Sequence, residues 1–482
     1  MDCFSEGSGA RERVLTDLDL LQHIFSELDL TNLLQAVPLV CRAWRDAQAS
    51  PGRCWEALEI DGLRLTKGPP VASQQGQRLW RRLAAWLARR AGGLRQLRLA
   101  NLRHLLQALE DGERLAALAQ LWHALGGGCG GGGACAAPAL HALDIGRSSI
   151  GLAPGTVAAM ACLPQLRVVR LHTASHLEFA ELDSLAGGLP LLEALHVCLM
   201  RRRGEFCAFR GAFPRRLAGL RRLRSLRLEA PYSALNAPSC ALPEAVDGWS
   251  EQLEELHLIN LGLESLPASI GGLRKLRELC LGRNRLGLRP NAIPWEVTQL
   301  TSLTRLELQY NGFEAGPPAV VGELPSLVEL NIGGNLWGSA CSDLPPEYAQ
   351  LTRLRYLTLT NCELSALPPV VRCLPSLELL KLNINKIQTL PGGPYLRRLE
   401  GLDLSHNRFT AGYPAALAAA SRLEIISFQH DGRHYSDPAV ALRDALAPLP
   451  PPGDPPAQQG TAAAAAAAPV VTAVALPLAF GI

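Results

Sequence analysis

Leucines recur along this chain at a spacing that neither a single helix nor a single long strand produces. The clearest string has apolar residues at Leu276, Leu279 and Leu281, followed by Asn284 and Leu286. Residues two apart in a strand point to the same face, so Leu279 and Leu281 predict a short strand with one buried side. The asparagine falls at the bend after the strand, where its amide can bond backbone groups that the turn leaves free.

The same string returns at regular distances. Successive strings start 23, 27, 24, 27, 23, 22 and 24 residues apart, at Leu253, Leu276, Leu303, Leu327, Leu354, Leu377, Leu399 and Leu423. Periods of about 20–29 residues are typical of leucine-rich repeats, in which each unit adds one strand to a continuous parallel sheet. Leu-Pro pairs after several strands predict short helical or irregular segments on the outer side. The sequence therefore predicts an α/β fold class, a curved leucine-rich-repeat solenoid with parallel strands on its concave face.

Weaker strings and changes of composition divide the rest of the chain. Strings that keep only the leucine strand start near Leu94, Leu140, Leu166, Leu192 and Leu223. A glycine-rich insert covers residues 126–133, and a stretch rich in proline and alanine follows residue 448. We expect a disordered N-terminus at 1–14, a helical unit at 15–60, a linker and joining helix at 61–93, irregular repeats at 94–250, regular repeats at 251–448 and a poorly ordered Pro/Ala-rich tail at 449–482.

Residues 15–60 have helical spacing instead of repeat spacing. Leu20, Leu21, Ile24, Phe25 and Leu28 form one apolar face. Two more short apolar segments follow before the first repeat. A helical unit of this kind could serve as the cap that covers the open end of a solenoid.

The same residues resemble an F-box. The resemblance rests on DLLQHIFSEL at 19–28, LVCRAWR at 39–45, and Trp55. It implies a helical segment that binds a Skp-type adaptor and through it a cullin complex. The chain departs from the family where Thr16-Asp17 replaces the usual Leu-Pro and where an extra residue accompanies Pro38. By resemblance, the adaptor-binding positions are Leu20, Leu21, Ile24, Phe25, Leu28, Leu34, Val40, Cys41, Trp44 and Trp55. The next segment, with Trp80 and Trp86, is similar to the joining helix of green-lineage F-box/leucine-rich-repeat proteins.

An F-box-like segment in front of leucine-rich repeats predicts a function. The resemblance implies the substrate-recognition subunit of an SCF-type (Skp-cullin-F-box) ubiquitin ligase, which is a non-catalytic receptor. The alternative is a leucine-rich-repeat scaffold that binds proteins and whose N-terminal helices only cap the solenoid, with no link to ubiquitination. Nucleic-acid binding through the arginine-rich segments 77–103 and 200–227 is disfavoured, because they lack interleaved aromatic residues on a platform and a known reader motif.

The residue between the second and third leucines of each repeat must point out of the concave face. In four consecutive repeats this position is basic: Arg170, His196, Arg227 and His257. Stacked strands bring these side chains into one positive strip, which would suit an acidic or phosphorylated protein substrate, because arginine binds carboxylate and phosphate bidentately. In the alternative interpretation they pair with neighbouring acids such as Glu229 or Glu255 and bind nothing.

Composition excludes several other classes. The net charge is +3, so no global field marks a nucleic-acid or membrane binder. The first 13 residues lack the apolar core of a secretory signal, and Pro469 and Pro477 interrupt the apolar tail, so we expect no membrane segment and a location in the cytoplasm or nucleus. The 13 cysteines form no C-x-x-C pair, and the H-E-x-x-H, G-x-S-x-G, phosphate-loop and dinucleotide-binding motifs are missing. We therefore expect no enzyme activity, no metal and no cofactor.

Overall fold

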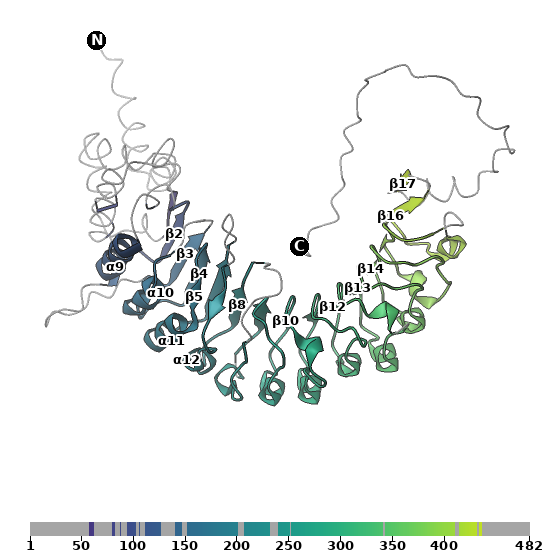
Figure 1. Ribbon diagram of the computed structural model, residues 1–482, viewed down its shortest axis with the longest axis horizontal. Coiled ribbons are helices and arrows are strands. Elements are labelled where there is room, and N and C mark those ends of the chain that lie inside the picture. Colours follow the sequence, from purple (N-terminus) through teal and green to yellow (C-terminus); the bar gives the residue numbers. More distant parts are fainter. Residues whose placement is uncertain are drawn as a thin grey trace, which may run out of the picture.

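One curved sheet organises this computed structural model (Figure 1). Its strands lie on the inner side of the arc and the helices on the outer side. Within the described residues the sheet has 15 strands in the order β1-β2-β3-β4-β6-β8-β9-β10-β11-β12-β13-β14-β15-β16-β17. The predicted solenoid and its concave parallel sheet are confirmed. The structure describes residues 57–61, 80–81, 87, 94–102, 106, 111–126, 140–146, 152–200, 207–231, 240–250, 252–340, 343–409, 414–430 and 433–435, with a few single positions missing inside these ranges.

The strands are short, and those of the regular half have only three residues in most repeats. Their bounds are β1 Ala57–Asp61, β2 Gln96–Ala100, β3 Ala142–Gly146, β4 Val168–Thr173, β6 Ala194–Leu199, β8 Ser225–Glu229, β9 Glu255–Ile259, β10 Glu278–Cys280, β11 Arg305–Glu307, β12 Glu329–Asn331, β13 Tyr356–Thr358, β14 Leu379–Lys381, β15 Gly401–Asp403, β16 Ile425–His430 and β17 Arg433–Tyr435. A second, two-stranded sheet pairs β5 Leu177–Glu178 with β7 Phe209–Arg210.

The outer side changes along the array. The irregular half carries α-helices, namely α9 Asp111–Gly126, α10 Thr156–Ala159, α11 Phe179–Gly188 and α12 Arg215–Ala218. The regular half carries 3₁₀ helices, among them η5 Ala268–Gly272, η7 Trp295–Gln299, η8 Ala319–Glu323, η10 Pro346–Gln350, η11 Pro369–Cys373 and η13 Ala415–Ala419. Each of these six is preceded by a proline, because proline fixes φ near the helical value but ends the preceding turn. In η5, η10 and η11 this proline belongs to a Leu-Pro pair, as the sequence predicted.

A ladder of asparagine side chains holds successive regular repeats together. Asn284 shows the pattern: its Nδ2 donates to Leu258 O at 2.6 Å in the preceding repeat, and its Oδ1 accepts from Leu261 N at 2.9 Å and Leu263 N at 3.2 Å. Equivalent bonds are made by Asn311, Asn335, Asn385 and Asn407. The buried amide thus satisfies strand-end backbone groups that no strand neighbour reaches.

The sheet begins earlier than expected. Residues 57–61 form β1, which pairs in parallel with β2, although the spacing predicts a helical unit up to residue 60 and a first repeat at Leu94. The sequence does contain the signal, because Trp55, Leu58 and Ile60 have the spacing of the first three apolar positions of a repeat. Leu58 therefore belongs to the repeat sheet and not to the helical unit.

Two other expectations concern the ends of the array. The last strand, β17, runs antiparallel to β16 and so departs from the parallel repeats expected up to residue 448. An antiparallel hairpin is a way to end a parallel array, because it covers the open edge without another repeat. The N-terminus 1–14, nearly all of the glycine-rich insert and the tail 449–482 lie outside the described residues.

Candidate protein-binding surface

A single row of side chains crosses the concave face from one end of the array to the other. Strand pairing places one central residue of each strand directly opposite the next. This row, called here the central row, matches the column expected from the repeats, including the irregular half. Its members are Arg98, Asp144, Arg170, His196, Arg227, His257, Cys280, Glu307, Asn331, Thr358, Lys381 and Asp403.

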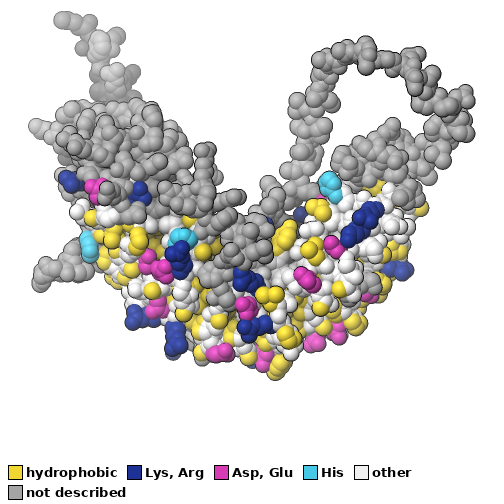
Figure 2. Space-filling view, viewed as in Figure 1, with side chains coloured by type: hydrophobic (Ala, Val, Ile, Leu, Met, Phe, Trp, Pro, Cys, Tyr) yellow, Lys and Arg dark blue, Asp and Glu magenta, His cyan; other side chains and the backbone are white. Residues whose placement is uncertain are grey.

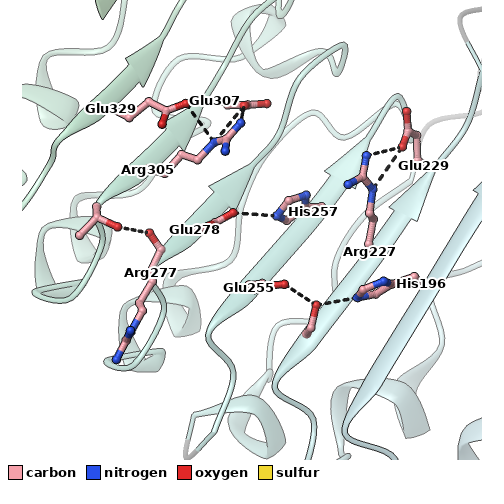
Figure 3. A network of polar contacts seen from close by, with 12 residues as sticks. His196, Arg227, Glu229, Glu255, His257, Arg277, Glu278, Arg305, Glu307 and Glu329 are labelled. Atoms are coloured by element: carbon pink, nitrogen blue, oxygen red, sulfur yellow. Dashed lines mark hydrogen bonds and ion pairs between the residues drawn. The ribbon is translucent and has the colours of Figure 1, made fainter. Parts of the chain in front are cut away.

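Strand pairing aligns the four positions of the predicted strip, but their side chains carry less positive charge than expected. His196 is about half-buried, and burial, with a smaller contribution from Arg170, lowers its pKa to about 4. The ring is therefore neutral at pH 7. Its Nε2 lies 2.8 Å from Ser225 Oγ, which donates to Glu255 Oε2 at 2.7 Å, so the imidazole N–H donates to the serine (Figure 3).

Two of the other three members of the strip, Arg227 and His257, also lie close to acidic side chains. Arg227 donates to Glu229 Oε2 through Nη2 at 2.9 Å and through Nε at 3.3 Å. His257 Nε2 lies 3.5 Å from Glu278 Oε2, and burial, followed by the nearby Arg227, lowers its pKa. Arg170 is exposed. The side chains therefore do not make a continuous positive strip, because burial favours the neutral form of the two histidines and Glu229 pairs with Arg227.

A carboxylate cluster centred on Arg305 lies beside the strip, and the central row alone does not reveal it. Arg305 bonds Glu307 Oε1 through Nη2 at 2.5 Å and reaches Glu329 Oε1 through Nε at 3.1 Å (Figure 3). Burial raises the pKa of Glu329, and Arg305 opposes that shift. Strand pairing aligns this arginine with Glu278 and Glu329 on the neighbouring strands, in the row two residues before the central one. On the face seen in Figure 2, basic and acidic side chains are interspersed along the arc.

We expect the stability of the protein to fall as the pH drops from about 6.5 to about 4, in part through His196. The unfolded side chain takes up a proton below about 6.5, whereas the folded one does so only near 4. The unfolded state therefore binds more protons in this window, and stability is lost as pH falls. Because the ring is partly exposed, we expect a loss of about 1 to 2 kcal/mol. Urea unfolding at pH 7 and pH 5 measures it.

The matched variants for this measurement are His196→Gln and His123→Gln. His123 is an exposed residue of α9. The His196 variant should lose less stability between pH 7 and pH 5 than the parent, and the His123 variant should behave like the parent. Identical pH dependence in all three proteins would contradict the assignment.

The ten positions assigned to adaptor binding lie outside the described residues. Trp55 has a second assignment, because it stands three residues before Leu58, as the first leucine of each repeat does. In the part of the chain that the structure describes, no helix has the length and apolar character needed to cross a bilayer. Among those same residues, no cluster of three or more His, Cys, Asp or Glu side chains is arranged to hold a metal ion.

Comparison with known proteins supports both the F-box-like segment and the leucine-rich repeats of this chain. A family model described as F-box-like matches residues 18–60. The leucine-rich-repeat-containing G-protein coupled receptor 5 of Xenopus tropicalis is 32% identical over 147 residues, which cover 30% of this chain and 15% of the receptor. A probable inactive serine/threonine-protein kinase of Dictyostelium discoideum is 30% identical over 134 residues, or 28% of this chain and 5% of the kinase. The chain thus spans a small part of the length of these curated relatives.

Among solved structures, a leucine-rich-repeat protein of Leptospira interrogans has 20% identity and a TM-score of 0.41, with 80% of this chain and 98% of that chain covered. The family-model match and the parallel sheet of this chain show that an F-box-like segment and leucine-rich repeats occur together in it, as the sequence predicted. F-box and leucine-rich-repeat families are typically non-catalytic interaction modules. The two parts support a role in binding other proteins.

Proposed function

We propose that this chain, an F-box-like segment followed by a leucine-rich-repeat solenoid, is the substrate-binding subunit of an SCF-type ubiquitin ligase. The observation that carries the proposal is where the two parts meet. The F-box-like match ends at residue 60, inside strand β1 at Ala57–Asp61, which pairs along its full length with β2. The match therefore runs directly into the repeat sheet. A direct join of this kind would hold a bound substrate at a fixed distance from the adaptor and the cullin.

The adaptor side of the proposal rests on the helical apolar face of the F-box-like segment. Leu20, Leu21, Ile24, Phe25 and Leu28 would supply the first part of the surface for a Skp-type adaptor, and Leu34, Val40, Cys41, Trp44 and Trp55 the rest. Large apolar side chains at the centre of an interface contribute most of its affinity. The solenoid alone does not require all of them, because a cap needs only one covered face.

The substrate side rests on the concave sheet. We place the substrate over the row that contains Arg170, His196, Arg227 and His257, which strand pairing aligns on four neighbouring strands. A carboxylate or phosphate of the substrate would bind the exposed Arg170 directly and would replace Glu229 at Arg227. The neutral histidines would contribute hydrogen bonds and not charge. Cullin and ubiquitin-transfer steps belong to the other subunits of the complex.

Replacing Leu20 and Leu21 together with alanine tests the proposal. We expect binding of a Skp-type adaptor to weaken by about two orders of magnitude, because truncation of two leucines that the adaptor would cover removes on the order of 3 kcal/mol. Co-purification with the adaptor, followed by titration, measures the loss, and far-UV circular dichroism checks that helicity is retained.

The matched control is Leu288→Ala, which truncates an exposed leucine of the solenoid (67% accessible) and should leave adaptor binding unchanged. If the parent itself does not co-purify with the adaptor, the N-terminal helices only cap the solenoid and the scaffold alternative is correct. If the folded double variant binds the adaptor like the parent, the assignment of Leu20 and Leu21 to the adaptor surface is wrong.

A further inference from the structure

A second row of residues lies along the edge of the sheet where the strands end. Each of its members stands three positions after the central-row residue of its repeat. In the seven regular repeats from β9 to β15 the residue of this second row has a left-handed backbone, with φ between 55° and 71°. Backbone hydrogen bonds tie the position to the neighbouring repeat, for example Tyr310 N to Gly333 O at 2.9 Å and Ile384 N to Ser405 O at 3.0 Å. We call these residues the rim row: Asn260, Arg283, Tyr310, Gly334, Asn361, Ile384 and His406.

The two large apolar members of the rim row do not suit its backbone. A left-handed conformation favours glycine and asparagine, as at Gly334 and Asn361, and it is unfavourable for bulky and above all for β-branched side chains. Tyr310 and Ile384 nevertheless adopt it, with φ of 56° and 57°. Their side chains are 43% and 48% exposed, so core burial does not offset the cost. The fold would be served as well by asparagine at both places, which points to a role outside folding.

The ring of Tyr310 is held in place by its neighbours. The guanidinium carbon of Arg283 lies 4.9 Å from the ring centroid, at cation–π distance. The ring also covers Gly334, where an added Cβ would lie only 2.3 Å from Tyr310 Cε1. A fixed, half-exposed aromatic side chain loses little conformational entropy when it binds a partner. The adjacent cation adds a preference for an acidic group next to the residue that contacts the ring.

The geometry points to a further binding site: we infer that the rim row binds an extended segment of a partner protein. Tyr310 and Ile384 are three repeats apart, which at strand spacing is about 14 Å. An extended peptide advances about 3.3 Å per residue, so two of its residues four positions apart match that distance and point to the same side. The segment should therefore carry apolar residues at positions i and i+4, with an acidic residue beside the one that contacts Tyr310. The inference rests on the proposed role of the solenoid as the substrate-binding part.

The test uses a phage-displayed library of random 12-residue peptides, panned against the full chain bound to a Skp-type adaptor. Enriched peptides are synthesised, labelled and titrated into the parent and into Tyr310→Asn and Ile384→Asn. We expect the enriched sequences to share the i, i+4 apolar pair with a flanking acidic residue. Each Asn variant should bind them at least tenfold more weakly, with a urea unfolding midpoint equal to or above that of the parent and with unchanged adaptor binding.

Two controls distinguish peptide binding at the rim row from binding elsewhere on the solenoid. Trp295→Ser removes a more exposed apolar side chain (66%) from η7 on the outer side and should leave peptide binding unchanged. Arg170→Glu with Arg227→Glu tests the central row. Peptides that lose affinity only for this charge-reversed variant would overturn the rim site while the proposed function stands. The inference also fails if panning enriches no sequence, or if both Asn variants bind the peptides like the parent. It fails as well if sedimentation velocity shows that the parent forms a dimer that Tyr310→Asn abolishes, because the rim row would then bind a second copy of this chain.

Discussion

Replacing Asn335 with alanine should lower the free energy of unfolding by about 3 to 5 kcal/mol. Its Oδ1 accepts from Asn311 N at 2.7 Å and Phe313 N at 3.4 Å, and its Nδ2 donates to Leu308 O at 3.0 Å and Ile332 O at 2.8 Å. The side chain is almost completely buried, so the variant leaves these backbone groups without water or protein partners. Each unsatisfied buried group costs about 1 to 3 kcal/mol, reduced where the backbone relaxes.

Urea unfolding followed by circular dichroism measures this loss. The matched control is Asn331→Ala in the same repeat, because Asn331 is only half-buried on the concave face and its Oδ1 accepts one local bond, from Gly333 N at 3.1 Å. We expect the control to lose less than about 1 kcal/mol. Equal losses in the two variants would show that the ladder contributes no more than an ordinary surface bond.

The repeat array could be predicted from the sequence because each repeat contains the pattern of apolar and polar positions that determines which side chains are buried. Leu279 and Leu281 give the strand and its inner face, Asn284 gives the bend, and the spacing to the next string gives the parallel neighbour. Once the strings are aligned, the strand register follows, which is why the pairing of Arg170 with His196 and of His196 with Arg227 could be expected even in the irregular repeats. Stacking identical units leaves little freedom for another register.

The electrostatics of the surface could be predicted only in part: the alternative interpretation named Glu229 and Glu255 as partners, and Glu229 does pair with Arg227. The charge of His196 depends on how far its neighbours bury it, and the pairing of Arg227 with Glu229 depends on side-chain directions within one strand. The start of the sheet was missed for a different reason. The string around Leu58 begins with Trp55 in place of leucine and overlaps the F-box-like match, so the helical interpretation covered it.

The rim row shows a related limit. The left-handed backbone at Tyr310 and Ile384 is a property of the repeat, but the sequence suggests it only where the same position holds asparagine or glycine, as at Asn361 and Gly334. Tyrosine and isoleucine are ordinary strand residues in sequence patterns. Only the structure reveals that these two side chains are exposed on a backbone that disfavours them.

Replacing Arg305 with methionine should destabilise the protein by about 3 kcal/mol at pH 7. The guanidinium bonds Glu307 and contacts Glu329, whose side chains are only 11% and 17% exposed, so the variant leaves two poorly solvated carboxylates close together without the cation that they contact. Removing one partner of such a buried pair costs about 3 to 5 kcal/mol, and partial exposure places this case at the lower end. Methionine keeps most of the apolar stem, so the loss reports charge more than packing.

The cost of Arg305→Met should shrink as the pH falls from 7 towards 4.5. Without the cation, burial and repulsion from Glu307 keep the pKa of the Glu329 carboxyl above that of an unfolded glutamate, near 4.3. The folded variant then takes up protons before the unfolded chain does, so acidification stabilises it relative to the parent. Adding Glu329→Gln should recover about half of the loss at pH 7, because it removes one of the two uncompensated charges. A loss that is the same at both pH values, or that Glu329→Gln does not reduce, would mean that Arg305 acts through packing. The carboxylates would then tolerate one another on the concave face, and a bound partner would not need to neutralise them.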